Sequence, residues 1–341
     1  MASMSQIQYL LVLFLIIASW SSQVLSRKLQ DTLLSERHEL WMAKHDKVYK
    51  DAAEKEKRFK VFKENVEYIE SFNAASNKPY KLSINQFADQ TNDEFKAYRN
   101  GLKSLHELMT ITGTSFKYEN VTDIPVAIDW RKRGAVTPIK DQGQCGSCWA
   151  FSTVAATEGI HQLTSGKLVS LAEQELVDCD RKGEDHGCKG GYMEDGFEFI
   201  RKNGGITTEA NYPYTASDGT CNTNKEKSHI VTIKGYEKVP PNSEDALLKS
   251  VANQPVSVSV DAGGNFQFYS SGIFEGECGT ELDHGVTAIG YGIGDDGTKY
   301  WLVKNSWGTS WGEQGYIRMK RDINAKEGMC GIAMDASYPT A

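Results

Sequence analysis

The 341-residue sequence predicts an α+β protein, and three observations support that class. Apolar residues recur at a helical period over residues 31–76, in a charge-rich segment almost free of glycine and proline. A second helical pattern begins at Cys148 and continues to Ile160. Short runs of β-forming residues follow at 256–262, 285–292, 299–305 and 315–321. We therefore expect helices near 32–45 and 51–76, another helix from Cys148, and a sheet built from the C-terminal runs.

The first 26 residues have the pattern of a secretory signal peptide. They contain no charged side chain, and Leu10 to Ala18 is an unbroken apolar run that is too short to span a bilayer. The Lys or Arg that usually precedes such a run is missing. We expect cleavage before Arg27 and a product in the secretory pathway. No later run approaches membrane length, so we expect no membrane partner.

Charge and cysteine content narrow the class of protein further. The formal net charge is −7, and the acidic excess lies after Ile124, which argues against nucleic acid or an anionic membrane as a partner. All seven cysteines also follow Ile124. An odd number in a secreted chain leaves at least one thiol unpaired in a monomer. We infer that one cysteine is reserved for chemistry.

The strongest candidate for that cysteine is Cys148, in the stretch Gln142–Phe151. Gly143 and Gly146 supply flexible backbone just before it. A helix N-terminus favours the thiolate, which is the nucleophilic form of cysteine. Half of a zinc site is a weak alternative because no second pair completes it. A redox pair with Cys145, or two structural cysteines in an oxidised protein, stay open at this point.

A cysteine nucleophile needs a base and a group that orients the base. His284 is the best base because it opens an apolar strand, whereas the other histidines lie before Ile124, far along the helix from Cys148, or in polar stretches. The others are His38, His45, His106, His161, His186 and His229. Asn305 ends the next strand and would orient the imidazole, with Trp307 shielding their hydrogen bond from water. The Gln142 amide and the Cys148 N–H would stabilise an oxyanion.

Two spaced motifs lie in the front segment. One is Glu54-x3-Arg58-x3-Phe62-x2-Asn65-x3-Ile69-x3-Asn73, along one or two neighbouring helix faces. The other is Ser83-x-Asn85-x-Phe87-x-Asp89, in alternating, strand-like spacing. Both spacings resemble the propeptides of papain-like cysteine proteases, with Ser83 where that family has glycine.

With Cys-Gly-Ser-Cys-Trp at 145–149, an established signature of the family, residues 32–341 resemble papain-like cysteine proteases, the family of papain and cathepsin L. Within it the chain is similar to the plant branch of senescence-associated cysteine endopeptidases. The resemblance implies a papain-like two-domain fold, with a helical domain carrying Cys148, a β-barrel-like domain carrying His284 and Asn305, and an active-site cleft between them. The implied segments are a signal peptide at 1–26, a mainly helical inhibitory propeptide at 27–123 and a peptidase domain at 124–341.

The function implied is that of a cysteine endopeptidase made as an inactive precursor. It would hydrolyse peptide bonds through a thioester, in general protein degradation, without a metal or organic cofactor. Its partners would be polypeptide substrates, its own propeptide and cystatin-like inhibitors. The propeptide would lie in the cleft in the opposite chain direction to a substrate. We expect a monomer. The implied location is a vacuole, a lysosome-like acidic compartment or the cell exterior. We expect acid to loosen the propeptide, because its carboxylates would lose their salt bridges to the enzyme.

The resemblance also assigns particular residues. The disulfides would be Cys145–Cys188, Cys179–Cys221 and Cys278–Cys330, which leaves Cys148 free. Residues 100–123 would form an exposed linker carrying the glycosylation sequon at Asn120. The substrate-binding residues would be Gly190, Gly191, Tyr192, Met193, Ser259, Leu282, Asp283, Gly285, Trp307 and Asp335.

Within that set, Gly191 and the Asp283 carbonyl would hold the substrate backbone, next to Lys189 where the family has asparagine. The pocket would favour bulky apolar side chains. Asp335 at its floor would also admit Arg or Lys; the alternative is that Asp335 is a surface-loop carboxylate.

Two other functions stay open from sequence. A secreted thiol–disulfide exchanger would use Cys145 and Cys148 as a redox pair, whereas a protease has one reactive thiol. A catalytically silent binding protein would keep the fold without activity. Thiol labelling and an epoxide-inhibitor assay distinguish these possibilities.

Overall fold

The structure is a computed structural model that describes residues 12–15, 30–75, 77–102, 116–181, 183 and 185–341. The chain divides into two units, Met1–Tyr68 and Ile69–Ala341. Among the described residues, no helix is long and apolar enough to cross a membrane. Most of the expected signal peptide lies outside the described residues.

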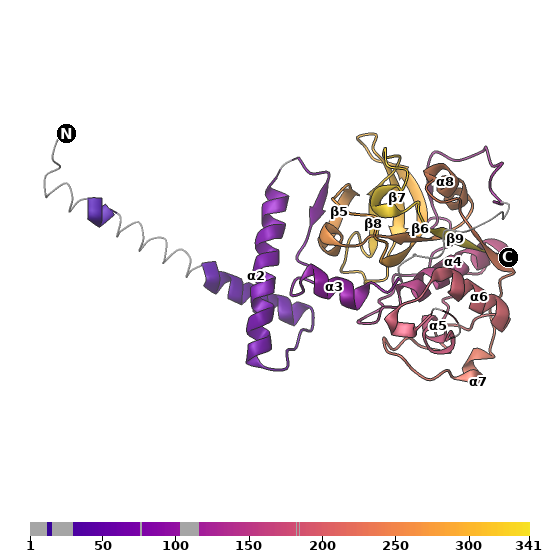
Figure 1. The fold of residues 1–341 in the computed structure, drawn as a ribbon, viewed down its shortest axis with the longest axis horizontal. Helices are drawn as coiled ribbons and strands as arrows, with labels where there is room; N and C mark the ends of the chain where they lie inside the picture. The colour runs from indigo at the N-terminus through magenta and orange to yellow at the C-terminus, as the bar shows by residue number, and fades with distance from the viewer. Residues whose placement is uncertain (1–11, 16–29, 76, 103–115, 182, 184) are drawn as a thin grey trace. The chain divides into compact units, whose positions relative to one another are not determined.

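The described part of the first unit is mainly helical. It contains a helix over residues 30–44 and the first part of α2 (Ala52–Ala74), which continues past Tyr68 (Figure 1). Trp41 and Phe62 are buried, with ring centroids 5.1 Å apart, and His38 lies 4.9 Å from Phe62. Arg58 donates to Glu54 one turn earlier at 2.7 Å. The two helices expected from the periodicity are therefore present, because their apolar stripes bury against each other.

The second unit is built on a nine-stranded sheet in the order β1-β5-β8-β7-β6-β4-β9-β3, with β2 paired to β6. The strands are β1 Tyr80–Leu82, β2 Ile128–Asp129, β3 Gly235–Lys238, β4 Val256–Val260, β5 Tyr269–Phe274, β6 His284–Ile293, β7 Lys299–Lys304, β8 Tyr316–Lys320 and β9 Ala336–Thr340. The four expected β-rich runs correspond to β4, β6, β7 and β8. Among the described strands, the end strands β1 and β3 do not pair with each other, so the sheet stays open where a barrel-like closure was expected.

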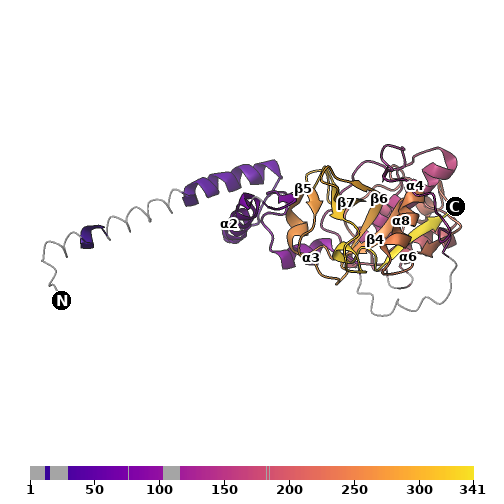
Figure 2. The same cartoon turned by 90° about the horizontal axis from the view of Figure 1, so that it is seen from above.

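Further helices complete the second unit. They are α3 Asn92–Arg99, α4 Cys148–Ser165, α5 Glu173–Cys179, α6 Met193–Asn203, α7 Thr223–Glu226 and α8 Glu244–Asn253, with short 3-10 turns at η1 Gly187–Lys189, η2 Gly264–Phe268 and η3 Met329–Gly331. The long helix α4 packs against β6 and β4 on one flank and against α5 and α6 on the other (Figures 1 and 2). It therefore joins the helical half to the sheet half.

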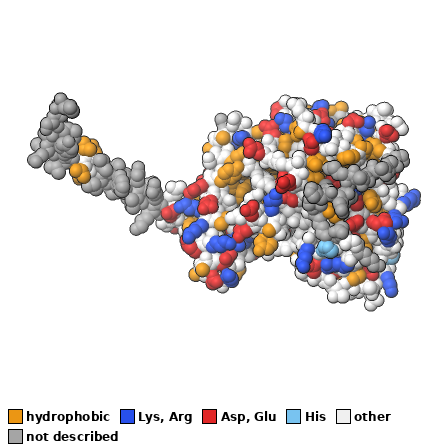
Figure 3. Space-filling view, in the orientation of Figure 1, with side chains coloured by type: hydrophobic (Ala, Val, Ile, Leu, Met, Phe, Trp, Pro, Cys, Tyr) orange, Lys and Arg blue, Asp and Glu red, His pale blue; other side chains and the backbone are white. Residues whose placement is uncertain are grey.

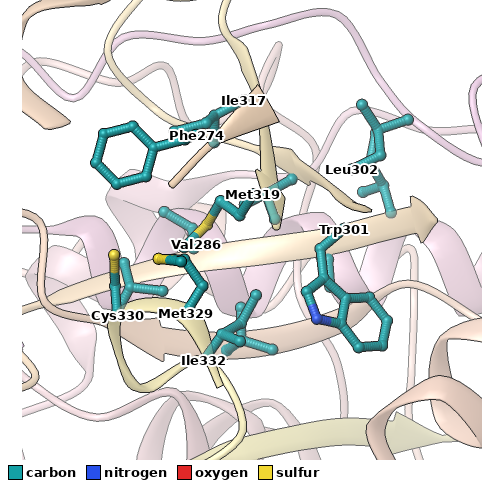
Figure 4. Close-up of a cluster of buried hydrophobic side chains, with 14 of the residues drawn as sticks. Phe274, Val286, Trp301, Leu302, Ile317, Met319, Met329, Cys330 and Ile332 are labelled. Atoms are coloured by element: carbon teal, nitrogen blue, oxygen red, sulfur yellow. The ribbon is translucent and has the colours of Figure 1, made fainter. Parts of the chain in front are cut away.

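Two hydrophobic cores correspond to these halves. One lies within the sheet half and includes the fully buried Trp301, Ile317 and Met319 (Figure 4). The other surrounds the first turns of α4 and includes Trp149 and Phe197. Each half thus has its own core, as the two-domain expectation requires.

The segment 83–89 is not the strand that its alternating pattern suggested. The strand β1 ends at Leu82, and residues 86–89 form a turn. Asn85 causes the change, because its side-chain oxygen accepts the Phe87 N–H at 3.0 Å while its amide donates to the Gln267 carbonyl at 2.8 Å. A side chain that bonds its own backbone two residues on favours a turn over a strand.

The linker expected to be exposed is partly buried at both described ends. Leu102 is 9% exposed and Tyr118 is 7% exposed. The Tyr118 hydroxyl donates to Gln254 at 2.8 Å, and its ring packs 5.1 Å from that of Tyr338. Residues 103–115 lie outside the described residues, and Asn120 is exposed.

The surface of the second unit carries charges of both signs. On the face shown in Figure 3, acidic and basic side chains are interspersed rather than segregated. Such a face does not produce the single-sign field that steers a polyanion.

Candidate active site

Cys148 is the first residue of α4, as its sequence pattern predicted. The preceding turn is held by the Gly146 N–H, which donates to the Cys188 carbonyl at 3.0 Å, and by the Cys145–Cys188 disulfide. The other disulfides are Cys179–Cys221 and Cys278–Cys330, so all three implied pairs are present. Cys148 is the free cysteine, and it is buried. The only group of three possible metal ligands within the described residues contains the bridged Cys179 and Cys221, whose sulfurs are not thiolates.

His284 reaches this site through β6, of which it is the first residue. The N–H of the next residue, Gly285, donates to the Cys148 sulfur at 3.3 Å. A side chain at position 285 would meet Met193 Sδ at 3.0 Å and the Cys148 carbonyl at 3.4 Å, so glycine permits this close approach. The start of the strand thus lies directly against the sulfur.

Asn305 and Trp307 fix the imidazole from the other side. His284 Nε2 and Asn305 Oδ1 are 2.8 Å apart, and the same Oδ1 accepts the Ser306 N–H at 2.8 Å. An amide oxygen can only accept, so Nε2 carries the proton and Nδ1 is the nitrogen that can take another. The fully buried Trp307 ring stacks on the imidazole with centroids 4.4 Å apart. Trp307 therefore excludes water from the His284–Asn305 bond.

Burial makes both groups neutral at neutral pH. It raises the pKa of Cys148 to about 11, against the opposing N–H donors of Gly285 and Gly101. It lowers the pKa of His284 to about 4, although the hydrogen bond that His284 donates to Asn305 favours the charged form. The thiolate expected at the helix N-terminus is thus absent from the precursor, because desolvation outweighs the helix dipole.

The covering segment is residues 99–102, which begin at the last residue of α3. The Gln142 side-chain amide donates to the Arg99 carbonyl at 2.8 Å, and the Gly101 N–H donates to the Cys148 sulfur at 3.3 Å. The Gly191 N–H donates to the Gly101 carbonyl at 2.9 Å, and the Leu102 N–H donates to the Asp283 carbonyl at 3.1 Å. Backbone groups of this segment therefore occupy the donors and acceptors expected to bind substrate.

Gly190 and Gln142 are held in place for these contacts. Gly190 has φ +104°, and a Cβ there would lie 2.6 Å from the Gly101 carbonyl oxygen, so both its conformation and the close approach require glycine. The Gln142 oxygen accepts the Ser306 hydroxyl at 2.6 Å, and its amide also donates to the Cys145 carbonyl at 2.8 Å. Ser306 was missed by the sequence analysis; its position after Asn305 was the available signal.

The expected specificity pocket is filled by Leu102. Its side chain belongs to the same buried cluster as Tyr192, Met193 and Leu282. No sequence spacing marked residues 99–102, because a glycine shortly after a helix usually signals only the end of the helix.

Asp335 is not a surface-loop carboxylate. It is 6% exposed and accepts the Ser259 hydroxyl at 2.7 Å. Lys238 lies 3.6 Å from Asp335 and 3.5 Å from Glu194. The carboxylate is thus already matched by a cation and a hydroxyl.

Aromatic and charged contacts anchor the segment before residue 99. Phe95 and Phe87 are buried edge-on to Trp307, with centroids 4.9 and 5.9 Å away. Lys96 pairs with Asp283 at 2.9 Å, and Arg99 pairs with Asp141 at 3.4 Å. In both pairs the segment before residue 124 supplies the cation, which differs from the expectation that it would supply the carboxylates.

Comparisons with known proteins agree with this arrangement. Residues 124–340 match the papain family cysteine protease, and residues 38–95 match the cathepsin propeptide inhibitor domain (I29). The senescence-specific cysteine protease SAG39 of Oryza sativa subsp. japonica is 59% identical over 94% of this chain and 95% of its own length. The senescence-specific cysteine protease SAG12 of Arabidopsis thaliana is 54% identical over 96% of this chain and 98% of its own.

Solved structures agree as well. The recombinant stem bromelain precursor has a TM-score of 0.82 and 47% identity over 90% of this chain and 98% of its own. The proform of the ragweed pollen cysteine protease Amb a 11 has a TM-score of 0.84 and 45% identity over 90% of this chain and 94% of its own. The family match, the inhibitor domain and the proform structures together establish a zymogen whose propeptide is its intramolecular inhibitor. The chain belongs to the papain family of cysteine proteases, in its propeptide-bearing precursor form.

Proposed function

We propose that this cysteine protease cleaves peptide bonds with Cys148 as nucleophile, His284 as general base and acid, and Asn305 as the group that orients the imidazole. One observation carries the proposal. The His284–Asn305 hydrogen bond lies under Trp307 while the adjoining Gly285 N–H touches the Cys148 sulfur. A nucleophile, a base and a shielded orienter therefore meet at one point.

The reaction begins once the propeptide leaves. Solvation and the α4 N-terminus then favour transfer of the thiol proton from Cys148 to Nδ1 of His284. The thiolate attacks the carbonyl carbon of the substrate. The substrate oxygen then accepts the hydrogen bond from the Gln142 amide that the Arg99 carbonyl accepts in the precursor. The His284 imidazolium protonates the departing amine, and water activated by the same imidazole then hydrolyses the thioester. Protein groups and one water molecule supply these steps.

Maturation would remove residues 1–26 as a signal peptide and 27–123 as the propeptide, leaving 124–341. The start of the papain-family match at residue 124 supports the second of these boundaries. The propeptide chain would run through the cleft in the opposite direction to a substrate chain. The propeptide forms a parallel bridge between Leu102 and Gly191. This differs from the antiparallel pairing that an added strand commonly forms.

The acyl side of the substrate would lie on Gly190 and Gly191, with the Asp283 carbonyl accepting a backbone N–H. Its main side chain would enter the pocket of Tyr192, Met193 and Leu282 that Leu102 now fills. Gly285 and Ser259 lie at the same strand pair, β4 with β6. An apolar occupant in this precursor supports a preference for bulky apolar side chains.

The enzyme would act as a monomer in general protein degradation, in a vacuole, a lysosome-like compartment or the cell exterior. Three disulfides suit an oxidising secretory route. The exposed Asn120 would carry a glycan that is lost with the propeptide. Cystatin-like proteins that enter the emptied cleft would inhibit it.

Purified precursor, matured in acid, tests the proposal with a fluorogenic peptide and a thiol-reactive epoxide. We expect hydrolysis that the epoxide abolishes by modifying Cys148. Cys148→Ala and His284→Ala should lose at least about 1000-fold in kcat, and Asn305→Ala should lose less. Hydrolysis by Cys148→Ala at the wild-type rate would overturn this assignment. Labelling of both Cys145 and Cys148 in the native protein would support a redox pair instead.

A further inference from the structure

The cleft wall that Arg99 covers contains an acidic position to which no role has been given. Asp141 lies directly before Gln142, and its Oδ1 accepts both the Gly143 N–H at 2.9 Å and the Arg99 guanidinium at 3.4 Å. The Arg99 side chain is 9% exposed and lies 4.8 Å from the centre of the Phe87 ring. The propeptide thus presents a buried guanidinium to Asp141.

The position of Asp141 relative to Cys148 identifies the part of the substrate that it faces. This step rests on the proposed function. Leu102 lies on the acyl side, in the apolar pocket, and Gly101 contacts the sulfur. Arg99 lies on the other side of Gly101, next to Gln142. Asp141 therefore lies on the leaving-group side of the scissile bond.

The surroundings of Asp141 suit a cationic side chain. A pocket of about 440 Å³ opens beside it and is lined by Pro138, Lys140, Asp141, Phe151, Ser170, Glu209 and Tyr214. The one cation there, Lys140, is bound to Glu158 at 3.0 Å and to Glu173 at 2.6 Å, so it does not neutralise Asp141 or Glu209.

Aromatic groups form the walls of the same pocket. The Phe151 and Tyr214 rings pack edge to face with centroids 4.8 Å apart, and the Tyr214 hydroxyl donates to the Gln142 carbonyl at 2.8 Å. Aromatic walls beside two carboxylates favour a guanidinium or ammonium group.

A second cation–carboxylate pair joins the propeptide to the cleft. Lys96 of the propeptide pairs with Asp283 at 2.9 Å. When the propeptide leaves, Asp141 and Asp283 both lose their cationic partners. The emptied cleft then carries two carboxylates without these cationic partners.

We infer that Asp141 selects peptides with Arg or Lys in the first two positions after the scissile bond. The side chain of Asp141 is 52% exposed. A half-exposed pair contributes modestly, so the preference for Arg over its uncharged counterpart norleucine should be about two- to fivefold in kcat/KM. It should shrink at high ionic strength, because solvent ions screen exposed charges.

Quenched-fluorescence peptides test this with the matured enzyme. The acyl side is held constant, and each of the two leaving-group positions carries Arg, norleucine or Glu. The readout is the ratio of kcat/KM values within each enzyme, which is insensitive to a general loss of activity. The variants are Asp141→Asn, and Asp245→Asn as a control at a carboxylate that is 71% exposed on α8.

We expect wild type and Asp245→Asn to share the order Arg, norleucine, Glu, and Asp141→Asn to lose most of the Arg-to-norleucine ratio. Cleavage of all three peptides at equal rates by wild type, or an unchanged ratio in Asp141→Asn, would overturn the inference and leave the proposed function standing. Failure to cleave any peptide would overturn the proposed function itself, and the inference with it.

Discussion

Replacing Gly101 with alanine should open the precursor. A Cβ at position 101 would lie 1.7 Å from the Gly146 carbonyl oxygen and 2.2 Å from its carbon. Gly146 cannot retreat, because its N–H is bonded to the Cys188 carbonyl at 3.0 Å and the disulfide at Cys145 holds the turn. The propeptide segment must therefore move away from the cleft.

The magnitude follows from the contacts that this movement breaks. They are the hydrogen bonds from Gly101 to the Cys148 sulfur, from Gly191 to the Gly101 carbonyl, and from Leu102 to the Asp283 carbonyl. At about 0.5–1.5 kcal/mol each, the loss of these three bonds weakens the closed state by about 1.5–4.5 kcal/mol. The open fraction should rise about 10- to 1600-fold.

Alkylation of the intact precursor measures that fraction, because Cys148 is the free cysteine. Full-length Gly101→Ala should react with iodoacetamide faster than wild type by this factor, as followed by intact mass. The control is Gly235→Ala, where the new Cβ would have its nearest contact at 3.6 Å. Alkylation of Gly101→Ala at the wild-type rate, with unfolding temperature unchanged, would refute the reasoning.

Three further predictions concern acid, thiols and specificity. Burial lowers the pKa of His284 to about 4 from its usual 6.5, so the closed precursor is most stable above about pH 6.5 and loses stability as the pH falls toward 4. Hydrogen exchange of residues 99–102, measured in the Cys148→Ser precursor and corrected for intrinsic rates, should become faster over that range. An exchange rate that does not change with pH would contradict this. Thiol labelling of the native enzyme should detect one reactive thiol per chain. A second labelled cysteine would favour a thiol–disulfide exchanger instead. Asp335→Ala should change the ratio of Phe-Arg to Arg-Arg peptide hydrolysis by no more than about twofold. It should lower the free energy of unfolding by about 1–3 kcal/mol, because Ser259 and Lys238 lose a buried partner. A large change in the ratio at unchanged stability would place Asp335 in the specificity pocket instead.

Local patterns identified much of the fold. The apolar spacing around Trp41 and Phe62 predicted two helices that exist, and the pattern after Cys148 predicted α4. Strands with continuous apolar runs were also found. In contrast, β5 contains Ser270, Ser271 and Gly272, and β9 contains Pro339, so neither has a strong strand pattern. Their pairing with neighbouring strands decides their conformation.

The candidate site divides in the same way. Residue type and local context selected Cys148, His284 and Asn305, because a nucleophile, base and amide each stood at the end of a helix or strand. Their protonation depends on burial, which a helix N-terminus cannot reveal. The thiol is neutral because burial desolvates the sulfur, which outweighs the N–H that Gly101, from a distant part of the chain, donates to it.

By itself, the sequence determined the chemistry available to this protein: one odd cysteine, a histidine opening a strand, and a helical segment with propeptide spacing. Only the tertiary structure decided that Leu102 fills the pocket, that Asp335 is already matched by Lys238, and that Arg99 covers Asp141. The physical reason is that periodicity reports which face of an element is buried, whereas ion pairs and desolvation depend on residues brought together from far apart in the chain.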